Sequence, residues 1–67
     1  MYPNLKAEFT RKGLTLEKVA PQLNITVSTL SQKMTGKYPF TLKEAKIIKN
    51  NVLETDMSID ELFQEAS

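Results

Sequence analysis

Hydrophobic residues recur along the chain with the spacing of short amphipathic helices. The clearest set follows the i, i+3, i+4, i+7 pattern and comprises Leu16, Val19, Ala20 and Leu23. This spacing places the four side chains on one face of a helix. Asn24 then tolerates a left-handed backbone, so it predicts the end of that helix. Pro21 lies inside the segment, where it removes a backbone donor and crowds the carbonyl of Glu17. We therefore expect the helix to be bent or shortened near Pro21.

A second helix is predicted over residues 26–35. The Thr26 hydroxyl can accept a hydrogen bond from a free backbone amide, which makes Thr26 a suitable cap. Leu30 and Met34, an i, i+4 pair, form an apolar stripe. The other face is assigned to Val27, Ser28, Ser31, Gln32 and Lys33. A short helix with one apolar stripe and a mostly small, polar or cationic outer face suits the major groove of DNA.

Three further helices are predicted around this pair, and the first spans about residues 4–12. It begins beside Pro3 and ends at Gly13, and Leu5 and Phe9 share one of its faces. Its last turn is basic, which we attribute to a favourable interaction with the helix dipole rather than to a DNA contact.

The last two helices each begin with a capping box, in which a Thr or Ser is followed three residues later by Glu. These boxes occupy residues 41–44 and 58–61. The expected core positions of the fourth helix are Leu42, Ala45, Ile48 and Val52. The fifth helix carries Ile59, Leu62 and Phe63, which either close the core or meet a second copy; we expect a core role with a partial dimer contact. Five short helices with short connections predict a compact all-α bundle.

The order and spacing of these residues resemble the helix-turn-helix of the phage Cro and repressor family, of the XRE type. Ala20 lies where the family needs a small residue so that the two helices cross closely. Ile25 and Leu30 match the two buried apolar positions that follow. Asn24 replaces the usual glycine of the turn, and Leu16 replaces a frequent glutamine whose side chain reaches a phosphate.

The resemblance covers roughly residues 4–63, including the run 30–37 that closes the motif and the Phe-Thr-Leu sequence at 40–42. It implies a lambda-repressor-like bundle in which residues 1–67 form a single helix-turn-helix DNA-binding domain, with the motif at 16–35. It also implies a small Cro-type regulator of transcription that binds operator DNA sequence-specifically. Such a regulator occupies the major groove as a symmetric homodimer, on half-sites about one turn of DNA apart.

The second motif helix and its flanks supply the expected contacts to double-stranded DNA. Glutamine can pair bidentately with adenine, whereas serine bonds several bases and discriminates less. The expected base contacts are Val27, Ser28, Ser31 and Gln32. Backbone contacts position a protein on DNA without reading its sequence. They are expected from Lys18, Thr26, Thr29, Lys33, Lys37, Tyr38 and Lys43.

Charge is distributed unevenly along the chain, although the net charge is only +1. Between Glu17 and Glu44 there are four lysines and no acidic residue, whereas from Thr41 onward there are three lysines and six acidic residues. A cationic zone over the motif and an acidic tail suit a protein that offers one face to phosphate. An ordinary mixed-charge surface accounts for the same totals.

The composition argues against several function classes. A chain of 67 residues buries only about 60% of its unfolded surface and leaves little room for a pocket. Without cysteine or histidine, it lacks disulfides, thiolate sites, the commonest general base and the commonest metal ligand. We expect no enzymatic activity, no cofactor or metal, and no small-molecule ligand. There is no apolar run of about 20 residues and no signal-peptide pattern, so we expect a cytoplasmic location, on the DNA of a bacterial host.

A protein-interaction module of the same fold, antitoxin-like or antirepressor-like, is the alternative hypothesis. The acidic tail with its three apolar residues at 59, 62 and 63 supports it. The salt dependence of binding separates the two hypotheses. DNA affinity falls steeply with rising salt concentration, because the phosphate contacts release counterions.

Overall fold

The helices of the computed structural model, which describes residues 2–65, lie within a few residues of their predicted places. In chain order they are α1 (Pro3–Arg11), α2 (Leu16–Val19), the 3-10 helix η1 (Ala20–Leu23), α3 (Val27–Met34), α4 (Leu42–Ile47), the π-helix η2 (Ile48–Val52) and α5 (Ile59–Leu62). The prediction of an all-α fold is confirmed, and η1 and η2 directly continue α2 and α4. None of the described helices is both long and apolar enough to cross a membrane.

Hydroxyl side chains cap four of the helices. The residue before α2, α3, α4 and α5 accepts a hydrogen bond from the backbone N–H three positions on, with N···O distances of 3.1–3.3 Å. The caps are Thr15, Thr26, Thr41 and Ser58. Glu44 and Glu61 complete the two predicted capping boxes by accepting hydrogen bonds from the backbone N–H groups of the caps. These bonds satisfy donors that a helix start leaves without a partner.

The first motif helix is shortened at Pro21, as predicted. α2 ends at Val19, and the chain continues as η1 with Pro21 in its first turn. A proline at the start of a helical turn loses no hydrogen bond, because the first N–H groups of a helix have no partner within it. Asn24 ends η1 in the left-handed conformation, at φ 58° and ψ 40°, and its N–H donates to the Pro21 carbonyl. The prediction for Asn24 is confirmed as well.

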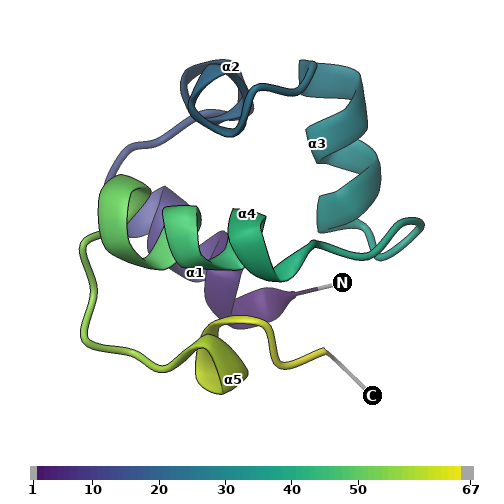
Figure 1. Ribbon diagram of the computed structural model, residues 1–67. Coiled ribbons are helices and arrows are strands. Elements are labelled where there is room, and N and C mark those ends of the chain that lie inside the picture. Colours follow the sequence, from purple (N-terminus) through teal and green to yellow (C-terminus); the bar gives the residue numbers. More distant parts are fainter. Residues whose placement is uncertain (1, 66–67) are drawn as a thin grey trace.

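One hydrophobic core joins all the helices. Its fully buried side chains are Leu5, Val19, Leu30, Ile48, Leu53 and Leu62. Burial of an aliphatic side chain of this size contributes about 1.5–3 kcal/mol. Figure 1 shows α4 crossing in front of α1, with α2 and α3 at one end of the molecule and α5 at the other. The core therefore fixes α3 at the end of the molecule opposite to α5.

Three aromatic rings connect the two ends of the chain. The ring of Phe63, after α5, lies edge-on to those of Tyr2 and Phe40, with centroids 5.7 and 5.1 Å away. The Tyr2 and Phe40 rings meet at 5.5 Å. In addition, the Asn4 side-chain amide donates a hydrogen bond of 2.8 Å to the Glu61 carbonyl. α5 is thereby held against α1 as part of the protomer.

Two leucines depart in part from their predicted roles. Leu42, predicted as core, is 64% exposed, because it occupies the first turn of α4 beside a surface hollow rather than beneath another helix. Leu62, predicted as a possible dimer contact, is fully buried within the protomer. The core role expected for Leu62 is thus confirmed, and the dimer contact considered for it is wrong, because a fully buried side chain cannot face a second copy. Ile59 and Phe63 are half-buried and border the same hollow as Leu42.

Candidate nucleic-acid interface

The outer face of α3 carries most of the residues predicted to contact bases. Buried Leu30 fixes which way α3 is turned. Ser28 and Gln32, four residues apart, then share the side of the helix away from Leu30. Ser28 is exposed, and Val27 in the same first turn keeps 41% of its surface exposed. Ser31 is half-buried and turns toward α1, where it lines a hollow.

Lys33 does not lie on the outer face, and that prediction is wrong. It follows Leu30 by three residues and therefore shares the inward face of α3. Its side chain is only 12% exposed and forms an ion pair with Glu44, with an Nζ···Oε1 distance of 2.6 Å. The same carboxylate oxygen accepts a hydrogen bond of 2.9 Å from the Thr41 backbone N–H. Lys33 joins α3 to the start of α4, so we leave it out of the DNA contacts proposed below.

The surroundings of Glu44 hold it in its charged form. Burial by itself raises the pKa of this carboxyl, but the hydrogen bonds from the Lys33 ammonium and the Thr41 backbone act in the opposite direction. The net pKa lies below the usual 4.5. The Lys33 ammonium also lies 6.0 Å from the centroid of the Phe40 ring, a favourable place for a cation. Glu44 is therefore charged at neutral pH.

Three exposed lysines surround α3. Lys18 lies in α2, Lys37 in the loop after α3, and Lys43 in α4. Among residues 2–65 the ion pairs are Arg11–Glu8 and Lys33–Glu44, so none of the three exposed lysines is paired there. They are free to bind an anion. The last turn of α1 differs, because the Arg11 guanidinium is held by Glu8 at 2.6 Å and lowers the pKa of that carboxyl.

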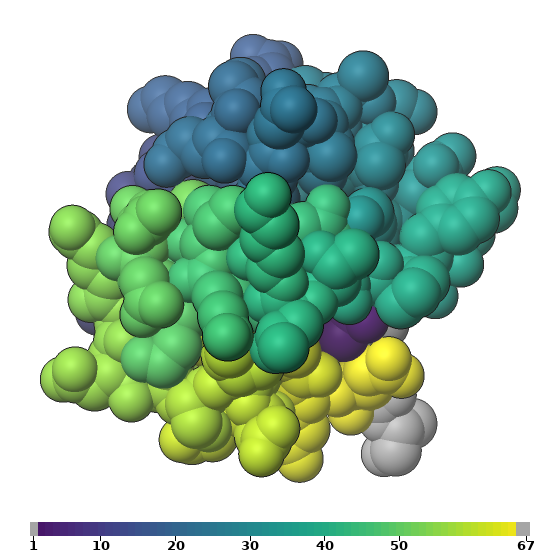
Figure 2. Space-filling model, viewed as in Figure 1, coloured from purple at the N-terminus to yellow at the C-terminus, as the bar shows by residue number. Residues whose placement is uncertain are grey.

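The loop that follows α3 projects from the molecule. Gly36 adopts a left-handed conformation, at φ 89°, and the Lys37 N–H donates to the Gln32 carbonyl at 3.0 Å. Gly36 therefore ends the helix. Tyr38 is 48% exposed, and the Lys37 ammonium lies 5.8 Å from its ring centroid. Figure 2 shows this teal loop as the lobe at the right of the molecule, where both side chains are accessible.

The start of α3 combines free donors with a hydroxyl pair. The Thr26 hydroxyl accepts a hydrogen bond from the Thr29 N–H at 3.1 Å and donates one to the Thr29 hydroxyl at 2.9 Å. Thr26 is therefore committed to capping. The Thr29 hydroxyl proton stays free to donate, because a hydroxyl is both donor and acceptor. The Val27 and Ser28 N–H groups belong to the first turn, where a helix offers no internal partner.

Acidic residues gather at the far end of the molecule. Asp60 and Glu61 lie in α5, which Figure 1 places away from α2 and α3. Two acidic residues lie near the motif, Glu17 in the first turn of α2 and Glu44, which is paired with Lys33 of α3. No group of three Asp or Glu among the described residues is arranged to hold a metal ion. The unpaired lysines on the elements next to α3 are thus separated in the fold from the acidic residues of α5.

The elements that carry the candidate interface are therefore α3, α2, the projecting loop and the start of α4. In comparisons with protein-family models, curated proteins and solved structures, nothing matched the chain. The candidate interface therefore rests on the geometry of α3 and of the exposed lysines around it.

Proposed function

We propose that the protein is a sequence-specific DNA-binding regulator of transcription, similar to the small Cro-type members of the phage repressor family. α3 lies in the major groove, where Ser28 and Gln32 contact base edges. The methyl groups of Val27, at the start of the helix, suit a thymine methyl. The regulator acts by occupying its operator.

The observation that carries this proposal is an uncharged outer face on α3 with unpaired cations around it. Between residues 18 and 43 the chain contains no acidic residue. Lys18, Lys37 and Lys43 are exposed on the elements next to α3. Small polar and amide groups in the middle suit base edges, and lysines at the margins suit phosphates. A helix face that only meets solvent does not require polar groups in its middle and lysines at its margins.

Two protomers bind together in this proposal, on half-sites about one turn of DNA apart. Leu42, Ile59 and Phe63 surround a surface hollow of about 330 Å³ between α4 and α5. Leu42 is among the most exposed large apolar residues of the described chain. We assign self-association on DNA to this patch, with Leu42 in place of the buried Leu62.

Binding measured against salt tests the proposal. A selection from random duplexes supplies a preferred site, and fluorescence anisotropy compares it with a scrambled duplex. Three lysine–phosphate contacts per protomer predict a slope of log K against log salt of about −3 per protomer. The selected site should bind at least about tenfold more tightly than the scrambled one. Absence of binding at about 50 mM salt, or a slope near zero, would contradict the proposal.

The same exposed patch supports a second candidate function, a module that binds another protein. Leu42 at 64% exposure, beside Ile59 and Phe63, is the observation in its favour. Partner binding through this apolar patch depends little on salt, whereas phosphate binding depends on it strongly. A Leu42→Lys variant separates the two on a duplex that carries a single half-site, because it removes partner binding, whereas one protomer still binds the half-site through the intact α3 face.

A further inference from the structure

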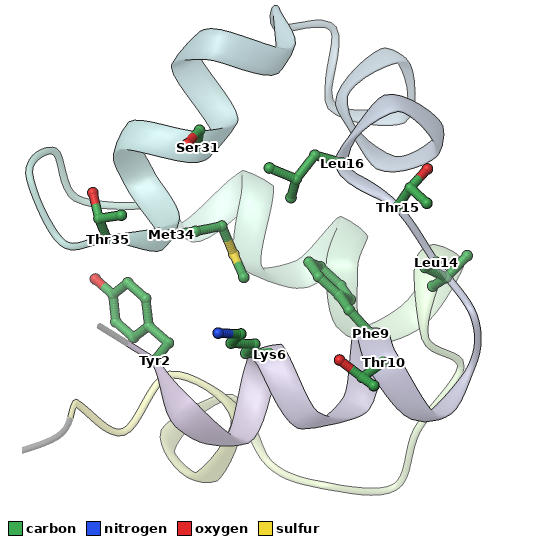
Figure 3. A pocket seen from close by; sticks show the side chains of 10 residues that line it. All are labelled: Tyr2, Lys6, Phe9, Thr10, Leu14, Thr15, Leu16, Ser31, Met34 and Thr35. Carbon is green, nitrogen blue, oxygen red and sulfur yellow. The ribbon is translucent and has the colours of Figure 1, made fainter.

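A surface hollow of about 310 Å³ lies between α1, the start of α2, and α3. Figure 3 shows the side chains around it. Its volume is at the lower end of the range for small-molecule sites, about 300–1,000 Å³. Its walls come from segments well separated in the sequence, so no local pattern indicates it.

The lining of this hollow is amphipathic. Phe9, Leu16 and Met34 supply apolar surface from α1, α2 and α3. Hydroxyl groups surround this surface, from Tyr2, Thr10, Thr15, Ser31 and Thr35. A ligand that combines a short hydrocarbon with a small polar head matches both kinds of surface.

Lys6 gives the hollow a positive charge. It is the charged member of the described lining, it is exposed, and it forms no ion pair among the described residues. In Figure 3 it lies on α1 between Tyr2 and Phe9, below the end of Met34. Glu65 does not line this hollow but the separate one between α4 and α5. There it faces Tyr2, and burial together with this carboxylate raises the pKa of the Tyr2 hydroxyl. The charge of Lys6 is thus not cancelled by a carboxylate within the lining.

We propose that this hollow binds an amphipathic monocarboxylate. The carboxylate pairs with the Lys6 ammonium, and the hydrocarbon lies on Phe9, Leu16 and Met34. In the liquid each water molecule takes up about 30 Å³, so a hollow of about 310 Å³ has room for about ten groups of that size. A carboxylate of about eight carbons contains about ten such groups. For so small a ligand in a half-open site, the dissociation constant is of the order of 1 mM.

Occupancy of this site is linked to α3, because α3 forms one of its walls. If a bound carboxylate changes the affinity of α3 for DNA, DNA changes the affinity for the carboxylate by the same factor. This consequence rests on the proposed function. Binding of the carboxylate does not, and it is measured in the absence of DNA, so that the two proposals can fail separately.

The experiment is a titration of ¹⁵N-labelled protein with octanoate, followed by amide chemical shifts. Octylammonium and octanol serve as ligands of similar size with the opposite charge and with none. Lys6→Gln tests the anchor, and Lys12→Gln is the matched control, because both lysines are exposed on or beside α1 and only Lys6 lines the hollow.

The proposal predicts saturable shifts at Thr10, Leu16, Ser31 and Thr35, and binding of octanoate at least about fivefold tighter than that of octylammonium. Lys6→Gln should weaken octanoate at least about fivefold, while Lys12→Gln changes it less than about twofold. Three results would overturn the proposal. They are non-saturating shifts up to about 10 mM, equal affinity for the two charged ligands, and shifts that map to the hollow beside Leu42 and Ile59.

Discussion

The ion pair between Lys33 and Glu44 makes a sharp prediction for stability. Glu44→Gln keeps the shape of the side chain and an oxygen that can accept from the Thr41 N–H, but it removes the negative charge. The Lys33 side chain, 12% exposed in the folded protein, then lacks the partner of its ammonium. Lys33→Met removes the other charge and leaves a side chain of similar length on the inward face of α3.

The magnitude follows from the burial of the pair. A hydrogen bond to a charged group contributes about 1.5–3 kcal/mol. Removing one partner of a fully buried ion pair, which leaves the other charge buried and unpaired, costs about 3–5 kcal/mol of stability. Because the lysine chain is flexible and can carry its ammonium into water, we expect Glu44→Gln to cost about 2 kcal/mol. Lys33→Met should cost about 1–2 kcal/mol, and the double variant should cost less than the sum, with a coupling of about 1–2 kcal/mol.

Thermal unfolding followed by circular dichroism measures these effects. In a domain of this size 1 kcal/mol shifts the melting temperature by about 4–8 °C, so Glu44→Gln should melt about 8–16 °C lower. Asp56→Asn, at an exposed position without an ion pair among the described residues, is the control and should change little. Single variants within about 0.5 kcal/mol of the wild type, or strictly additive effects, would refute the reasoning.

The dependence on pH follows from the same contacts. The folded protein holds the pKa of Glu44 below the usual 4.5, so the unfolded chain binds this proton more readily. The ion pair therefore stabilises the fold above about pH 4.5, and this contribution is lost as the pH falls from there through the folded pKa. The stabilities of the wild type and Glu44→Gln should converge on acidification. A constant difference down to about pH 2.5 would contradict this assignment.

Variants at four further positions test the interface, the turn and the Leu42 patch. Gln32→Ala should cost about 1–3 kcal/mol on the selected duplex only, by relaxing the preference at one base pair; Gln22→Ala is the control, and equal loss on every duplex would exclude base recognition. Lys37→Ala should weaken all duplexes alike and reduce the salt slope by about one, whereas an effect at a single base pair would exclude a phosphate contact. Asn24→Ala should cost about 1 kcal/mol in thermal unfolding, because alanine disfavours a φ of 58°, and Asn24→Gly should not destabilise. Leu42→Lys should weaken self-association on DNA, measured by sedimentation, and leave protomer stability unchanged; unaltered self-association would remove this patch from the interface.

Local chemistry made much of the fold predictable. The caps at Thr15, Thr26, Thr41 and Ser58 act over three residues, and hydroxyl geometry alone determines them. Pro21 and Asn24 likewise act on their own backbone, so the shortened α2 and the left-handed turn followed from residue type. The spacing of Leu30 and Met34 predicted the inward stripe of α3.

The features that could not be predicted depend on packing between segments that are distant in the sequence. The prediction places Lys33 on the outer face of α3, although its position three residues after Leu30 puts it on the inward face. Only the fold brings Glu44, 11 residues on in the chain, within reach to neutralise it. Leu42 fits the helical spacing of a core residue, but no helix covers the first turn of α4. Spacing alone also does not distinguish the π-helix at Ile48–Val52 from a continued α-helix.

The most direct test of DNA binding is an amide chemical-shift map of the labelled protein with a mixed-sequence duplex, at low and then moderate salt. The proposal predicts salt-sensitive shifts at Lys18, along Val27–Gln32, and around Lys37 and Lys43, together with shifts at Leu42, Ile59 and Phe63 where two protomers associate on the duplex. Absence of shifts at low salt in the folded protein, or shifts confined to α5 and Leu42, would contradict it and favour the protein-binding function.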